Sequence, residues 1–216
     1  GGDGVALTFL QLYQAGPNPP FRITHQFITS GNLSLPLANL TAFQVALLDD
    51  ATGRATAAAT TPDMLAAGLG MTTFMPRRTL QDPEIAALAQ CFAHNEGIGV
   101  LPDTVKYLHE RAADETGWLE RLAGIDVDTT MIWGLHDSVA PLRVANHVWQ
   151  TYVKDKPGRN RYWVVPGADH YVQCDAPGEV AQIIRMTTDE PVIALQTLGH
   201  RPEGAVLVDQ SGGDGQ

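Results

Sequence analysis

Two short apolar runs in the second half of the chain, each followed by a helical pattern, constrain its fold more than any other feature. Residues 129–133 (TTMIW) and 161–165 (RYWVV) have the length and the side chains of buried strands. Helical patterns over 140–153 and 177–187 follow them. Strands that alternate with helices form parallel βαβ units, so the sequence predicts an α/β fold with a mostly parallel sheet.

The first half of the chain contributes one more strand and a long helical block. Residues 5–15 have helical spacing, and residues 21–29 (FRITHQFIT) alternate like a strand that ends in the turn Ser30-Gly31-Asn32. From residue 36 to about residue 124 the chain is rich in Ala and Leu, which predicts several short helices without a strand. The longest expected helix covers 102–123. A helical block between strands is typical of a lid over the sheet.

Composition excludes several classes of function. The 216 residues are 44% hydrophobic, and 14 Lys and Arg face 24 Asp and Glu, a net charge of −10. This balance argues against nucleic acid and against anionic membranes as partners. No apolar run is long enough to cross a membrane. Cys91 and Cys174 are expected as free thiols in a reducing, cytoplasmic compartment, although one disulfide between them stays open.

The first candidate site residue is Asp137, in the turn that follows the strand TTMIW. Ligands of open parallel sheets bind beyond the carboxyl ends of the strands, where a carboxylate can orient a histidine. The alternative is that Asp137 only caps the helix that begins near Ala140, as Asp often does.

The second candidate is His170, in the turn PGADHYVQ that follows the strand RYWVV. Histidine is the natural general base near neutral pH. A loop histidine without a role is the alternative for this residue taken alone. Two such turns, acid first and histidine second, favour a catalytic pair. We therefore expect a hydrogen bond between Asp137 and His170 at one edge of the sheet.

Both turns also carry a family resemblance. W-G-x-x-D-x-x-x-P at 133–141 and P-G-A-D-H-Y-V-Q-x-D-x-P at 166–177 resemble the acid and histidine segments of α/β-hydrolases of the haloalkane dehalogenase and epoxide hydrolase type. The segment ITSGNLSLPLANLTAFQVALLD is similar to the strand that leads into the cap of that group, and VKYLHERAADETGWLERL resembles the exit from the cap. The subgroup that it resembles most is the one like the mesoderm-specific transcript protein. The resemblance covers most of residues 2–187.

The resemblance implies an α/β-hydrolase fold with an inserted helical cap, seen without its N-terminal strands. It divides the chain into a core segment at 1–35, a cap at 36–124, a second core segment at 125–189 and a tail at 190–216. The first segment would hold the helix after the nucleophile elbow and one strand. In this family the chain order is nucleophile, acid, histidine, which assigns Asp137 as the acid and His170 as the histidine.

The nucleophile itself is expected just before Gly1. The family's elbow reads small–x–nucleophile–x–Gly with a helix directly after it, and a helix near Val5 makes Gly2 the final glycine. Gly2-Asp3 also match the last two residues of the subgroup motif H-D-x-G-D. The alternative register makes Asp3 the nucleophile, with Val5 where the elbow needs glycine.

The implied function is hydrolysis of a small, mostly apolar substrate through a covalent ester. The substrate would be an epoxide or alkyl halide if the nucleophile is Asp, and a carboxylic ester if it is Ser. No cofactor is implied, the oligomeric state is open, and this chain alone is expected to be inactive. The alternative is a non-catalytic α/β-hydrolase-like binding protein or a truncated product.

The remaining candidates are weaker. Some dehalogenases carry their acid after the earlier strand, where this chain has Asn32, which can touch substrate or serve the turn. The aromatic residues Tyr107, Trp118 and Trp149 could line a substrate pocket, but aromatic side chains at helical spacing favour the core. Four histidines lack ligand partners at metal-binding spacing, so no metal site is expected, and His136 is expected to be exposed. They are His94, His109, His136 and His147.

Overall fold

The computed structural model describes residue 16 and residues 21–189 and 204–212. The predicted helix at 5–15 and the expected elbow around Gly1 and Asp3 lie outside the described residues. Of the predicted tail, only 204–212 is described.

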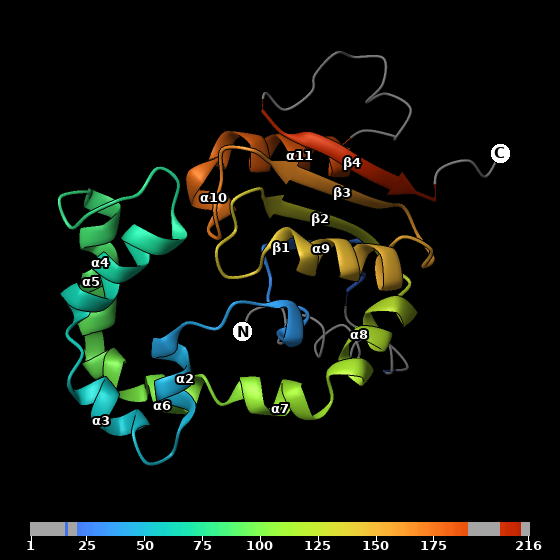
Figure 1. Ribbon diagram of the computed structural model, residues 1–216. Helices are drawn as coiled ribbons and strands as arrows, with labels where there is room; N and C mark the ends of the chain where they lie inside the picture. The colour runs from blue at the N-terminus through green and yellow to red at the C-terminus, as the bar shows by residue number, and fades with distance from the viewer. Residues whose placement is uncertain (1–15, 17–20, 190–203, 213–216) are drawn as a thin grey trace.

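The described residues form a four-stranded sheet of order β1-β2-β3-β4 (Figure 1). Its strands are β1 (His25–Thr29), β2 (Asp128–Gly134), β3 (Asn160–Val165) and β4 (Val206–Ser211). The first three are parallel, and β4 runs antiparallel to β3. Thr130 of β2 is paired with Phe27 on one side and Arg161 on the other. The three predicted strands are confirmed, and β1 is shorter than the predicted range 21–29.

The sequence did not predict β4. Its apolar run, Val206 to Val208, is exposed and shorter than the buried runs of β2 and β3. The strand pairs with β3, and the carboxylate of Asp209 also accepts a hydrogen bond from Trp149 Nε1 at 3.0 Å. Directly after the strand, φ of Gly212 is +73° and a Cβ would overlap the carbonyl oxygen of Gly158, so only glycine fits this turn.

Helices cover both faces of the sheet (Figure 1). One face packs against α8 (Glu115–Gly124), α9 (Leu142–Val148) and the π-helix η3 (Trp149–Val153). The other packs against α11 (Pro177–Asp189) and the short α10 (Val172–Asp175).

Alternation along β2 explains the two layers. Met131 and Trp133 lie in the first core and Ile132 in the second, and all three are fully buried. Successive side chains of a strand point to opposite faces, so a continuous apolar run is what a doubly covered sheet requires.

A curved set of helices, here called the helical arm (residues 35–113), extends from the sheet between β1 and β2 (Figure 1). The regular elements described in it are all helical, as the sequence predicts. They are η1 (Leu35–Leu37), α2 (Ala42–Leu48), α3 (Gly53–Ala58), α4 (Pro62–Thr73), α5 (Pro83–Ala93), η2 (His94–Val100), α6 (Leu101–Thr104) and α7 (Tyr107–Ala113).

The prediction of one helix over 102–123 is wrong. The segment forms α6, α7 and α8, and the chain leaves helical geometry at Asp114, where φ is −135° and ψ is 40°. The break has a packing reason, because α7 belongs to the arm while Leu119 and Leu122 of α8 are buried against the sheet. Helical spacing cannot show that two adjoining segments pack in different directions.

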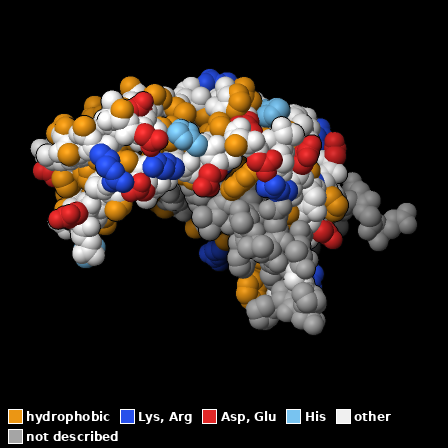
Figure 2. All heavy atoms as spheres, turned by 90° about the horizontal axis from the view of Figure 1, so that it is seen from below, with side chains coloured by type: hydrophobic (Ala, Val, Ile, Leu, Met, Phe, Trp, Pro, Cys, Tyr) orange, Lys and Arg blue, Asp and Glu red, His pale blue; other side chains and the backbone are white. Residues whose placement is uncertain are grey.

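No helix among the described residues has both the length and the apolar character to cross a membrane. Figure 2 views the molecule from below and shows acidic and basic side chains interspersed over the arm.

Candidate active site

The two predicted turns meet beyond the carboxyl ends of β2 and β3. His170 Nδ1 lies 3.0 Å from Asp137 Oδ1 and 3.3 Å from Asp137 Oδ2. The predicted hydrogen bond between the acid and the histidine is therefore present, although their catalytic roles stay a prediction.

Asp137 is buried and serves its own turn as well as the histidine. Its Oδ1 accepts hydrogen bonds from the backbone N–H groups of Val139 at 3.0 Å and Ala140 at 2.7 Å. The helix α9 begins only at Leu142, so these are bonds within the turn and not a cap of that helix. The carboxylate is fixed by the backbone in the position from which it faces His170.

His170 is partly exposed, with a fifth of its side chain accessible to solvent. Its ring packs edge-on against Tyr171, with ring centroids 5.3 Å apart. When Nδ1–H donates to a carboxylate, Nε2 is left with the lone pair and can accept a proton. The arrangement thus presents the nitrogen that a general base needs.

Gly134 lets the two turns approach each other. A Cβ at this position would overlap the carbonyl oxygens of Asp169 and Ala168. The adjoining backbone then bonds across the gap, from His136 N to Ala168 O at 3.0 Å and from Leu135 N to Val165 O at 3.0 Å. The last residue of β2 therefore has to be small for the acid and histidine turns to pair.

The sequence analysis missed Asp169, the residue directly before His170. This carboxylate is fully buried, and it accepts hydrogen bonds from the N–H of His170, from the N–H and hydroxyl of Ser138, and from Arg77. The donor atoms of His170 and Ser138 each lie 2.8 Å from Asp169 Oδ1, and Arg77 Nη1 lies 2.6 Å from Asp169 Oδ2. Burial raises the pKa of Asp169, but these donors outweigh it and hold the pKa below its ordinary value. The sequence feature that could have indicated this role is the acidic residue directly before His170.

A second buried carboxylate, Asp175, supports the same turn from the other side. Its Oδ2 accepts hydrogen bonds from the N–H groups of Asp169 and Met75, each at 2.9 Å, and Arg78 lies 3.3 Å from its Oδ1. Burial is the main cause of a raised pKa at Asp175. The histidine turn is thus fastened by two carboxylates that the motif alone did not distinguish.

The weaker candidates differ in how deeply the fold buries them. Trp149 is in the core and Trp118 packs against it, as favoured, while Tyr107 of α7 is half-buried. Asn32 is buried at the end of β1, and its Oδ1 has no hydrogen-bond partner among the described residues. His136 is exposed, as expected.

Cys91 and Cys174, both in the described part of the chain, are free and exposed. Within that part, no three His, Cys, Asp or Glu residues gather as a metal site would require.

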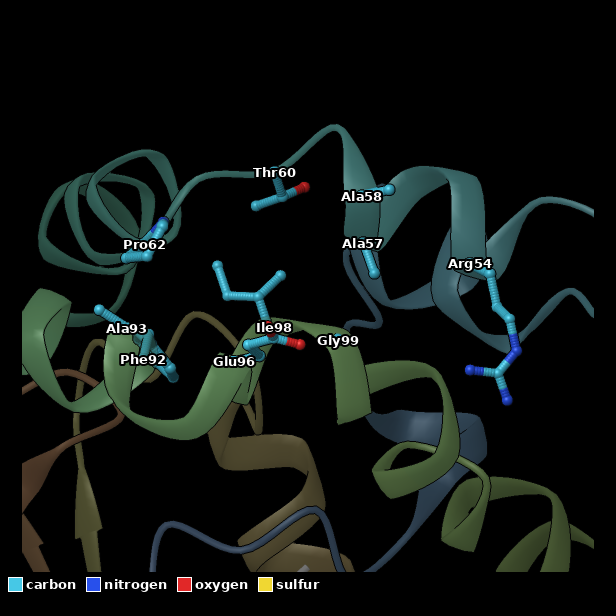
Figure 3. Close-up of a pocket in the computed structure, with 10 residues that line it drawn as sticks. All are labelled: Arg54, Ala57, Ala58, Thr60, Pro62, Phe92, Ala93, Glu96, Ile98 and Gly99. Carbon is cyan, nitrogen blue, oxygen red and sulfur yellow. The ribbon is translucent and has the colours of Figure 1, made fainter.

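A cavity of about 400 Å³ lies within the arm, away from the acid and the histidine (Figure 3). It opens between α3, the start of α4, the end of α5 and η2. Ala57, Phe92 and Ile98 supply much of its apolar wall, and Arg54 and Glu96 lie at its polar positions. Its residues come from elements other than the turns that hold Asp137 and His170.

Comparison with solved structures agrees with this architecture. The chain is similar to an esterase from Exiguobacterium antarcticum (17% identity, TM-score 0.61), covering 87% of this chain and 63% of that one. It is similar to an alpha/beta hydrolase fold protein from Burkholderia ambifaria (17%, 0.57), covering 85% and 62%. It is also similar to 2-hydroxy-6-oxo-6-phenylhexa-2,4-dienoate hydrolase from Rhodococcus sp. strain RHA1 (14%, 0.58), covering 86% and 60%.

No family model and no curated protein matches the chain. The chain spans about three-fifths of the length of the solved structures that it matches. At these identities the likeness concerns the fold. Together with the parallel strands and the helices on both faces, it shows that this chain has an α/β-hydrolase fold, with Asp137 and His170 paired where its strands end.

Proposed function

We propose that this chain supplies the acid and the histidine of a hydrolase that cleaves a small, mostly apolar substrate through a covalent ester. The observation that carries the proposal is the hydrogen bond of 3.0 Å between His170 Nδ1 and Asp137 Oδ1. A buried carboxylate that orients a partly exposed imidazole at the carboxyl ends of parallel strands is the arrangement of a general base.

In the proposed reaction a nucleophile from the elbow attacks the substrate and forms the ester. The bond that breaks is the carbon–halogen bond of an alkyl halide, a ring C–O bond of an epoxide, or the ester C–O bond of a carboxylic ester, whose alcohol leaves. His170 Nε2 then takes a proton from water as the water oxygen attacks the carbonyl of the covalent ester. When the C–O bond of that ester breaks, His170 gives the proton to the departing oxygen, which belongs to the alcohol product in the Asp branch and to the Ser hydroxyl in the Ser branch. Asp137 holds the tautomer and stabilises the imidazolium that forms when His170 takes the proton.

The identity of the nucleophile decides the substrate class. The resemblance to the haloalkane dehalogenase, epoxide hydrolase and mesoderm-specific transcript group favours Asp, placed just before Gly1, with Asp3 as the second position. An aspartate would displace the halide of an alkyl halide, or open an epoxide if a proton donor serves its oxygen. The similar solved structures described as esterases make a Ser nucleophile and a carboxylic ester the second branch.

The proposal extends to the partners and the location of the protein, for which charge and free thiols are the support. The excess of acidic residues favours a small-molecule substrate over nucleic acid or an anionic membrane. The two exposed free thiols favour a reducing, cytoplasmic compartment.

Under this proposal the nucleophile precedes Gly1, so the test uses a polypeptide that extends N-terminal to Gly1, with residues 1–216 assayed alongside. His170→Ala in the longer protein is exposed to an alkyl halide, an epoxide and a simple ester, and intact-protein mass spectrometry follows covalent adducts. With an Asp nucleophile the ester forms without the histidine, so the adduct should accumulate with the halide or epoxide. With a Ser nucleophile the histidine is needed for both steps, so acylation should fail.

The outcomes separate the branches. A stable alkyl adduct supports Asp, whereas no adduct and ester cleavage by the unmutated protein supports Ser. Turnover of none of the three substrates by the unmutated protein would favour the non-catalytic alternative. Activity of residues 1–216 alone would assign Asp3 as the nucleophile.

A further inference from the structure

The far end of the helical arm returns to the acid and histidine turns. This arm tip (residues 72–78) bonds to the core at several points. Ser138 Oγ lies 2.6 Å from Thr72 O and 2.8 Å from Asp169 Oδ1, so its one proton is shared between these two acceptors. Tyr171 N donates to Thr73 O at 3.4 Å, and Met75 N donates to Asp175 Oδ2 at 2.9 Å. The ring of Phe74 stacks on that of Tyr171, with centroids 4.8 Å apart. The arm is therefore joined to the site at its tip as well as at its base.

We propose that Asp169 is a positioning residue for His170 and that Arg77 of the arm tip is its counter-ion, so that the acid–histidine pair is held in alignment only while the arm is docked. The proposal rests on the proposed function for its catalytic meaning.

Asp169 connects the two turns. Its Oδ1 accepts hydrogen bonds from the N–H groups of His170 and of Ser138, the residue that follows Asp137, and it shares the hydroxyl proton of Ser138 with Thr72 O. One oxygen atom therefore fixes the backbone beside the acid and the backbone of the histidine at once. A shift of this carboxylate would move the two turns relative to each other.

Asp169 needs a cation in this position. Its side chain is fully buried, and an ionised carboxylate away from water is costly unless it is paired. Asp175, which supports the same turn, is also acidic, and the two carboxylates repel each other. Arg77 places its guanidinium 2.6 Å from Asp169 Oδ2, while Arg78 lies beside Asp175 and also pairs with Glu84. The opposite charge for Asp169 thus comes from the arm.

Arg77 is itself fixed by the arm. The same Nη1 donates to the carbonyl oxygen of Phe74 at 2.9 Å, and Phe74 is buried in the core of the arm. Undocking the tip would withdraw the cation and the carbonyl of Thr72 together. The charge that stabilises the histidine turn is therefore present only in the docked state.

The test measures the geometry of the pair in residues 1–216, and so does not depend on turnover. In chain labelled with ¹⁵N at histidine, the Nδ1 proton of His170 is observed by NMR and assigned through its loss in His170→Gln. We expect Arg77→Ala and Asp169→Asn to raise its exchange rate with water at least tenfold. Arg77→Lys, which keeps a cation at the site, should restore much of the protection.

Arg54→Ala is the matched control, because Arg54 is an arm arginine that pairs with Asp103 at 3.3 Å on the surface. It should leave the exchange rate within twofold. Arg77→Gln, which keeps a polar side chain and its first three carbons but removes the charge, replaces Arg77→Ala if that variant does not fold.

Exchange unchanged in both neutral Arg77 variants, or an equal rise in Arg54→Ala, would overturn the proposal. Absence of the Nδ1 signal in the unmutated chain would also count against it. Failure of the longer protein to turn over any substrate would count against the proposed function and leave this measurement intact.

Discussion

Gly134 lies directly against the backbone carbonyl of Asp169, closer than any residue with a side chain could come. The contact joins the end of β2 to the turn that carries His170. This backbone contact limits how far apart the acid and histidine turns lie, independently of their side chains.

Replacement of Gly134 by alanine should therefore destabilise the protein and misalign the pair. The added Cβ overlaps two carbonyl oxygens, so the backbone has to shift, at a cost of about 1–3 kcal/mol, the range for overpacking. Urea unfolding of Gly134→Ala measures it. Gly167→Ala is the control, because a Cβ there would meet no described atom within 4 Å. Equal stability of the two variants would show that the close approach does not constrain the turn.

Asp137→Asn should nearly abolish activity in the longer protein while leaving the fold intact. An asparagine can still accept the bonds from Val139 and Ala140, but its amide disfavours the tautomer in which Nε2 is the base. A loss of kcat on the order of 10³–10⁴-fold is expected, as for other acid–histidine pairs. Steady-state kinetics measures it with whichever of the three substrate classes the unmutated protein turns over, and exposed His136→Gln is the neighbouring control. A loss of less than tenfold would remove Asp137 from the mechanism.

Burial of His25 makes stability depend on pH. Its side chain is half-buried in β1 and bonded through Nε2 to Thr130 Oγ1 at 2.9 Å, and desolvation lowers its pKa to about 4. The unfolded chain binds a proton at His25 near pH 6.5, whereas the folded chain binds it only near pH 4. Folding with a neutral His25 therefore costs nothing extra above pH 6.5, and the free energy of unfolding falls as the pH drops from 6.5 toward 4. The loss by pH 5 should be on the order of 1–2 kcal/mol, after allowance for partial solvent screening of the ring.

The free energy of unfolding in urea at pH 7 and pH 5 measures this effect, as the difference between the unmutated chain and His25→Gln. The variant should lose less stability on acidification, whereas exposed His136→Gln should follow the unmutated chain. A pH dependence identical in the His25 variant would contradict the assignment.

Two adjacent isoleucines of α11 test the packing of the second core. Ile183 is fully buried against the sheet, and its neighbour Ile184 is 37% exposed. Ile183→Ala should cost about 2–5 kcal/mol, because it removes buried methylenes and leaves a cavity. Ile184→Ala should cost clearly less in the same denaturation experiment. A reversed order would mean that α11 packs through a different face.

The sequence was most informative where the pattern is local. The buried runs of β2 and β3 and the pairing of Asp137 with His170 follow from residues within a few positions of each strand end. β4 was not predicted because its apolar run, Val206 to Val208, is only three residues long and its partner strand lies more than forty residues away. An apolar run this short does not by itself identify a strand.

The carboxylates around the histidine were missed for a different reason. The donors that hold Asp169 come from Ser138 and Arg77, 31 and 92 residues away in the chain. The residues near His170 do not indicate that an arginine of the arm pairs with Asp169 in the folded chain. The break at Asp114 was missed likewise, because it follows from how α7 and α8 pack.

One side chain links the residues where the arm leaves the core to the residues where it returns to the core. Glu115, at the start of α8, accepts hydrogen bonds from Ser34 Oγ at 2.9 Å and Leu35 N at 3.0 Å, just where the arm begins. A segment whose two ends are pinned together can be exchanged as a cassette, because the core sees the same short gap whatever is inserted. Grafts that replace the arm should therefore keep Ser34 and Glu115 as their junction. They must also carry a cation at their far end, because the carboxylate of Asp169 stays behind in the recipient.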